Sequence, residues 1–81
     1  MIVQLKMFAV ARQLAGQDVV ELTLPEGARV ADLRGCLAEK YPELADLSDH
    51  LMFAIDTEYV SNDTEIPVGA EVACIPPVSG G

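Results

Sequence analysis

The last six residues of this 81-residue chain, Pro-Pro-Val-Ser-Gly-Gly, are its strongest candidates for chemistry. They end in the carboxylate of Gly81, which is a poor electrophile because it lacks a good leaving group. ATP can convert such a group into an acyl-adenylate, from which a nucleophile displaces AMP. A sulfide or persulfide then gives a thiocarboxylate, whereas a lysine amine gives an isopeptide bond. We therefore predict that Gly81 is the reacting group, and the tail fits both products.

The residues before Gly81 are suited to delivering it. Pro76 and Pro77 hold φ near about −65° and favour extended backbone at the residue before each, so a stiff stalk should leave the last strand. At ~3.3 Å per residue, six residues reach about 20 Å, far enough to enter another protein's active site. Val78 offers one apolar contact, whereas Ser79 and Gly80 present almost no side chain. We expect this segment to insert into a partner protein.

Other side chains offer no comparable constellation. His50 is the only histidine, and in "LSDHLM" it is more typical of a surface or helix-end residue than of a catalytic base. Cys36 and Cys74 are too few for a disulfide scaffold or a zinc site. Cys74 alternates with Val72, which is typical of a buried strand thiol. We expect no metal and no internal active site.

Hydrophobic periodicity predicts the elements that must position the tail. Alternation indicates strands in five stretches, "IVQLKMF", "DVVELTL", "LMFAID", "EYV" and "EVACI". "AVARQLAGQ" reads as one or two helical turns that stop at Gly16. Apolar residues then recur at helical spacing from Val30 to Tyr41, and Pro42 should end that helix.

The order of these elements is the outline of a ubiquitin-like β-grasp domain. We expect an α+β fold in which the first two strands form a hairpin and one main helix packs across one face of a mixed sheet. The domain should span residues 1–75, followed by a flexible, extended Gly-Gly tail at 76–81. This outline alone does not give a function.

Charge is distributed unevenly along the chain. The net charge is −8, yet the first 40 residues hold five acids and five bases, and the eight acids after Lys40 are accompanied by no Lys or Arg. Such a surface repels nucleic acids and anionic membranes and favours a basic protein partner. No leader-like segment opens the chain and no apolar run approaches ~20 residues, so we expect a cytoplasmic domain.

Three stretches, "VQLKMFAVARQLAG", "AIDTEYV" and "GAEVACIPPVSGG", give the sequence a specific resemblance. Over essentially its whole length the chain resembles the molybdopterin synthase small-subunit family, and "IPPVSGG" is the most specific part. Family members often have Asp where Ala70 stands and Asn where Asp56 stands. These departures concern turn and surface contacts more than the chemistry of the tail.

The resemblance implies a ubiquitin-like sulfur carrier of molybdenum cofactor biosynthesis, the non-catalytic subunit of a cytoplasmic heterotetramer. An E1-like adenylyltransferase would use ATP to adenylate Gly81, and a sulfur-donating enzyme would convert it to a thiocarboxylate (1-thioglycine). The tail would then enter the synthase large subunit, which supplies the catalytic side chains, and donate sulfur to cyclic pyranopterin monophosphate. No permanently bound cofactor is implied.

A docking surface should accompany the tail. Strand alternation places Phe8 and Ile75 on the sheet face opposite the helix, and Tyr59 on the short strand could join them. An exposed apolar cluster beside a functional tail is typical of the centre of an interface. We therefore predict that Phe8, Tyr59 and Ile75 contact the large subunit, within a rim of acids that meets basic residues.

Three alternatives remain open at this point. A sulfur carrier for thiamine, cysteine or tRNA thiolation would share the fold and the Gly-Gly end. A ubiquitin-like modifier would form isopeptide bonds instead, although only Lys6 and Lys40 are available for self-conjugation. The third alternative is an interaction domain whose tail is inert.

Overall fold

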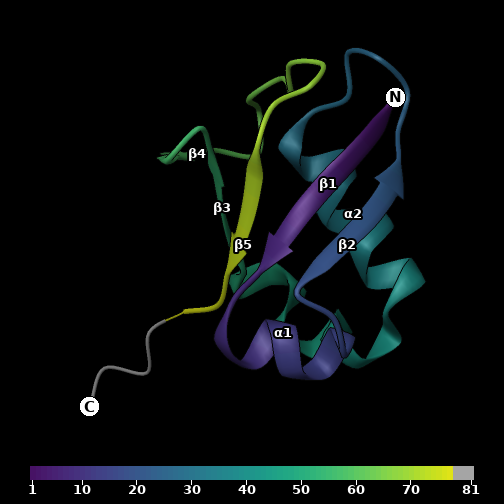
Figure 1. Ribbon diagram of the computed structural model, residues 1–81, viewed down its shortest axis with the longest axis vertical. Helices are drawn as coiled ribbons and strands as arrows, with labels where there is room; N and C mark the ends of the chain where they lie inside the picture. The colour runs from purple at the N-terminus through teal and green to yellow at the C-terminus, as the bar shows by residue number, and fades with distance from the viewer. Residues whose placement is uncertain (78–81) are drawn as a thin grey trace.

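The computed structural model describes residues 1–77, in which a five-stranded mixed sheet carries its main helix on one face (Figure 1). The strand order is β2-β1-β5-β3-β4; the central pair β1 and β5 is parallel and the other pairs are antiparallel. In chain order the elements are β1 (Ile2–Met7), α1 (Ala9–Ala15), β2 (Val19–Thr23), α2 (Val30–Lys40), η1 (Pro42–His50), β3 (Met52–Ile55), β4 (Glu58–Val60) and β5 (Val72–Ile75). The predicted β-grasp fold is confirmed.

Alternation along the strands separates an inner from an outer sheet face. In β1, Val3, Leu5 and Met7 are buried, and the residues between them are exposed. The register aligns Leu5 with Val72 of β5, so the inner faces of both central strands point toward α2. Burial of these side chains, each worth roughly 1.5–3 kcal/mol, makes the register costly to shift.

The main helix depends on packing and on one acidic side chain. Val30, Leu33 and Leu37 of α2 are buried against the sheet. Arg29, at the position before the helix, cannot accept a hydrogen bond with its side chain. The Asp32 carboxylate compensates by accepting the Arg29 backbone N–H at 2.8 Å. The helix ends before Tyr41, because Pro42 follows.

The nine-residue 3₁₀ helix η1 is the element that the hydrophobic pattern did not predict. Pro42 stands at its start, a position where a missing N–H costs nothing. Arg34 of α2 donates hydrogen bonds to the backbone carbonyls of Ser48 and Leu51, and its guanidinium lies 5.0 Å from the centre of the Phe53 ring. The side chain of a neighbouring helix therefore holds η1, which hydrophobic spacing within η1 could not reveal.

The short helix α1 returns the chain from β1 to β2 at the end of the sheet from which β5 leaves (Figure 1). Gly16 ends it in a left-handed conformation, with φ of 74°, and donates its N–H to the Arg12 carbonyl at 2.9 Å. No helix within residues 1–77 is long and apolar enough to cross a membrane.

Candidate functional site

The tail begins at the C-terminal end of β5, in the centre of the sheet. Phe8, directly after the parallel neighbour β1, donates its N–H to the Cys74 carbonyl at 3.2 Å, so the pairing holds β5 up to its last residues. Pro76 is buried and Pro77 is exposed. The predicted insertion residues Val78, Ser79 and Gly80 and the reacting Gly81 lie outside the described residues.

An apolar patch surrounds the point where the chain leaves β5. The register pairs Met52 with Ile75, and Phe8 follows Met7, the partner of Cys74. The side chains of Phe8, Met52 and Ile75 therefore share one row of the outer face. Phe8 is 39% exposed, Met52 is 46% exposed and Ile75 is half-buried. We call these three residues the tail-root patch.

The structure thus brings two predicted interface residues, Phe8 and Ile75, together and adds Met52, which the sequence reasoning missed. The alternation of "LMFAID", with Phe53 turned inward, could have identified it. Tyr59 is 62% exposed and lies opposite Ala54 on the same face, one row farther from the tail. These placements are compatible with an interface, and the interface itself stays a prediction.

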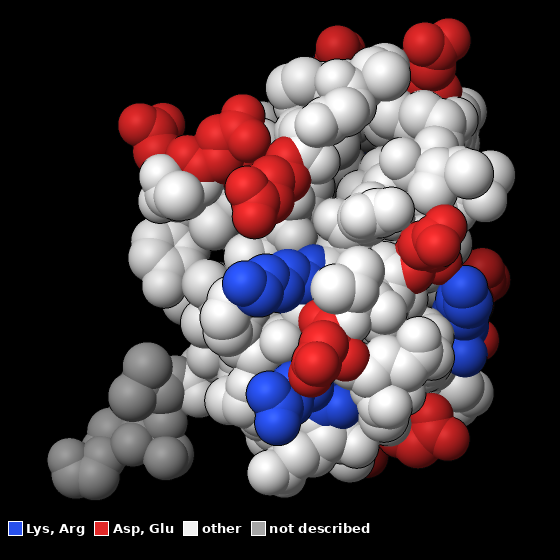
Figure 2. All heavy atoms as spheres, in the orientation of Figure 1, with Lys and Arg blue, Asp and Glu red and all other residues white. Residues whose placement is uncertain are grey.

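Acidic side chains gather beside the tail-root patch on the outer face of the sheet, over the β3–β4 hairpin and the start of β5 (Figure 2). Asp56, in the hairpin loop, donates its backbone N–H to the Glu71 carbonyl at 3.0 Å, which ties the loop to the strand that carries the tail. Within residues 1–77 the one ion pair joins Arg12 and Asp18, both well exposed, at 3.2 Å. The acids of the hairpin are therefore free to attract a basic partner.

The Cys74 thiol is poorly placed to carry sulfur. Cys74 is completely buried, and this burial raises its pKa from 9.0 to about 12, although the nearby Arg34 charge acts in the opposite direction. A thiol must ionise to act as a nucleophile, so Cys74 is inert at neutral pH. Cys36, on α2, is half-buried.

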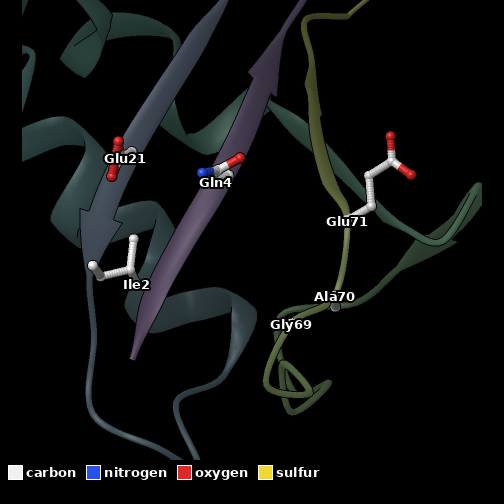
Figure 3. A pocket seen from close by; sticks show the side chains of 6 residues that line it. All are labelled: Ile2, Gln4, Glu21, Gly69, Ala70 and Glu71. Atoms are coloured by element: carbon white, nitrogen blue, oxygen red, sulfur yellow. The ribbon is translucent and has the colours of Figure 1, made fainter.

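A hollow at the opposite end of the sheet lacks the convergent groups of a catalytic site. It holds about 570 Å³ and lies on the outer face at the end of the sheet remote from the tail, between β1 and the segment before β5 (Figure 3). Glu21 and Glu71 line it from opposite sides, and the Glu71 side chain points away from Gln4 and Glu21. His50 is exposed at the end of η1, and no cluster within residues 1–77 could hold a metal ion.

Comparison with protein families matches residues 5–81 to the ThiS family. The molybdopterin synthase sulfur carrier subunit of Caenorhabditis briggsae is 35% identical, over 98% of this chain and 96% of the relative. The protein of the same name from Chlamydomonas reinhardtii is 38% identical, over 91% of this chain and 92% of the relative.

Solved structures agree with the fold. A putative molybdopterin converting factor, subunit 1, from Pyrococcus furiosus is 37% identical and covers 96% of this chain and 99% of its own, with a TM-score of 0.86. SAMP1 from Haloferax volcanii is 27% identical over the whole of both chains, also with a TM-score of 0.86. A chain from the complex of subunits 1 and 2 of the Helicobacter pylori molybdopterin-converting factor covers all of both chains at a TM-score of 0.69. Its 17% identity supports the fold alone.

Proposed function

The chain belongs to the ThiS family as a sulfur carrier of molybdenum cofactor biosynthesis, and we propose that it carries the sulfur as a thiocarboxylate on Gly81. The observation that supports this site is the extent of the family match, which runs through residue 81 and so includes Gly80 and Gly81. The Cys74 thiol is poorly suited to carrying sulfur, because it is buried with a raised pKa.

The proposed chemistry uses the carboxylate alone. An E1-like enzyme binds ATP, and a Gly81 carboxylate oxygen attacks its α-phosphorus with release of pyrophosphate. Hydrosulfide, generated by a sulfur-donating enzyme, then adds to the acyl carbon and loses its proton as AMP departs. The product is the thiocarboxylate, whose sulfur is the nucleophile for the next step.

The acceptor step takes place in a partner. The tail enters the large subunit of the synthase, where the thiocarboxylate gives up its sulfur to cyclic pyranopterin monophosphate, and water supplies the oxygen that returns Gly81 to the carboxylate. The domain contributes position: β5 fixes the origin of the tail, and the tail-root patch with Tyr59 holds the partner around it.

Mass spectrometry tests the proposal. The purified chain is incubated with the E1-like enzyme, ATP and sulfide, and its intact mass should change by the exchange of one oxygen for sulfur. A chain lacking Gly81 should keep its circular dichroism spectrum, because no core residue is touched, and should not gain sulfur. The Cys36→Ala and Cys74→Ala variants are matched controls that should still gain it. Sulfur gain by the truncated chain would contradict the proposal.

A second candidate is a protein modifier, because solved neighbours of high structural similarity include the small archaeal modifier protein 1 of H. volcanii. Both functions share the acyl-adenylate, and they differ in the nucleophile that displaces AMP. Incubation with cell extract and ATP separates them, since a modifier becomes attached to the lysines of other proteins.

A further inference from the structure

Another, smaller depression lies next to the tail-root patch. It holds about 220 Å³, and its lining residues come from β1, β3, β5, the residues that adjoin these strands and the hairpin loop: Lys6, Phe8, Ala54, Thr57, Glu71 and Ala73. Ala54 and Ala73 are aligned neighbours on β3 and β5, so two methyl groups stand where larger side chains would fill the surface. We call this depression the alanine socket. It is smaller than ordinary small-molecule pockets and fits a side chain better than a cofactor.

The wall formed by Thr57 has an unfavourable backbone conformation. Asp56 and Thr57 form the two-residue loop between β3 and β4, with φ of 50° and 73°. Positive φ at both positions is the pattern of a type I′ turn, which favours Asn or Asp followed by Gly. Asp56 suits this turn, whereas a β-branched residue at φ of 73° is strained.

Folding gains little in return for the strain at Thr57. The Asp56 side chain accepts the Glu71 backbone N–H at 3.3 Å, so Asp56 stabilises the loop. The Thr57 side chain is exposed and makes no hydrogen bond within residues 1–77. Its one structural role there is to line the alanine socket. A strained residue that gives the isolated domain nothing is a candidate for a role in binding.

We propose that the alanine socket receives one large apolar side chain of the synthase large subunit, and that Thr57 is a wall that determines which side chain fits. This inference rests on the proposed function, because the occupant is the protein that holds the tail. Phe8 belongs both to the socket and to the tail-root patch, so a partner seated on the patch also covers the socket. Glu71 at the rim suits a base beside the apolar side chain.

A second copy of this chain is a poorer occupant. With a net charge of −8, two copies brought face to face would set the acids beside this face against one another. Lys6 is a base on the same face, but its Nζ already lies 5.5 Å from the centre of the Phe8 ring of its own chain. A basic partner meets no such repulsion.

Two substitutions at one position test the proposal. Thr57→Gly removes both the strain and the wall, whereas Thr57→Asn relieves the strain, because Asn tolerates positive φ, and keeps a polar side chain of similar size. Both variants should melt at a higher temperature than the wild type. In titration calorimetry with the large subunit, Thr57→Gly should bind about fivefold more weakly, as expected for an interface residue outside the hot spot, and Thr57→Asn within about twofold of the wild type.

The outcomes separate this inference from the proposed function. A Thr57→Gly variant that binds as tightly as the wild type, or that gains no thermal stability, overturns the role of Thr57. Equal loss of affinity in Thr57→Gly and Thr57→Asn also overturns it. A wild-type dimer in sedimentation equilibrium would instead show that a second copy of the chain occupies the alanine socket, which overturns the proposed occupant. If the wild-type chain does not bind the large subunit at all, the proposed function itself fails.

Discussion

At the scale of single residues, the buried thiol of Cys74 should make the stability of the fold depend on pH. Its pKa is about 12 in the folded protein, and desolvation by burial is the main cause, whereas the unfolded chain ionises near the ordinary 9.0. Below about pH 9 the thiol is protonated in both states, so its contribution to stability is complete. Between about pH 9 and 12 the thiol ionises in the unfolded chain but not in the folded one, so this contribution is lost as the pH rises.

We therefore predict that the free energy of unfolding falls in alkali by up to about 1.4 kcal/mol per pH unit within this window through Cys74 alone. Urea unfolding measured from neutral pH to about pH 11 checks it. Cys74→Ala should flatten the slope, at a cost of roughly 1–2 kcal/mol near neutral pH for the cavity. Cys36→Ala is the control and should keep the wild-type slope. An unchanged slope in Cys74→Ala would show that other groups cause the alkaline loss.

At the scale of elements, Arg34 adds polar contacts between α2 and two other parts of the chain, the end of η1 and the loop that holds Asn62. It bonds the carbonyls of Ser48 and Leu51, and it also donates from Nε to the Asn62 side chain at 3.1 Å. We predict that Arg34→Ala lowers the free energy of unfolding by roughly 2–3 kcal/mol, because partly buried carbonyls lose their donors and the contact with the Phe53 ring is lost. Chemical denaturation followed by circular dichroism measures the change.

Arg12→Ala is the matched control for this prediction. Its ion pair with Asp18 is exposed at both ends, so its loss should cost less than about 1 kcal/mol. Arg34→Lys should recover only part of the stability, since an ammonium group cannot reach several acceptors with the geometry of a guanidinium. Equal effects of the two alanine substitutions would show that the contacts of Arg34 add nothing.

The elements differ in how far the sequence could predict them. Alternation located β1, β2 and β5, because one face of each is buried. Pro42 marked the end of α2 correctly. The 3₁₀ helix η1 was missed because the contacts that hold it are long-range: Arg34 of α2 donates hydrogen bonds to its end, and Leu44 packs into the core. The cap of α2 was missed as well, because Arg29 at the capping position has no side-chain acceptor and Asp32, three residues later, supplies the hydrogen bond instead.

The outer face, which we expect to bind the partner, could be predicted only in part. The alternation of side chains along the strands placed Phe8 and Ile75 on the outer face. The register between β3 and β5, which brings Met52 next to Ile75, joins distant parts of the sequence and could not be predicted from local patterns. The strain at Thr57 depends on the loop having two residues, which the strand limits of "AIDTEYV" did not define. The burial of Pro76 likewise required its three-dimensional surroundings.

At the scale of the whole molecule, the excess of acids predicts how the chain meets a partner. All eight acids after Lys40 lack a neighbouring Lys or Arg in sequence, and many gather on the side of the hairpin and β5 (Figure 2). Opposite charge on a partner accelerates encounter, and salt screens this attraction over a Debye length of about 30 Å at 0.01 M but under about 10 Å above 0.1 M. Association with the large subunit should therefore be sensitive to salt.

We predict that the association rate constant falls about tenfold between roughly 0.01 M and 0.3 M salt, while the dissociation rate constant changes little, because we expect apolar contacts of the tail-root patch, which salt does not screen, to hold the complex together. Stopped-flow fluorescence at several salt concentrations measures both constants. Glu71→Gln, at the rim of the face, should make the salt dependence shallower, and Glu26→Gln, in the β2–α2 loop, is the matched control with the same loss of charge. A dissociation rate that rises steeply with salt while association stays constant would mean that ion pairs, rather than the apolar patch, hold the complex together.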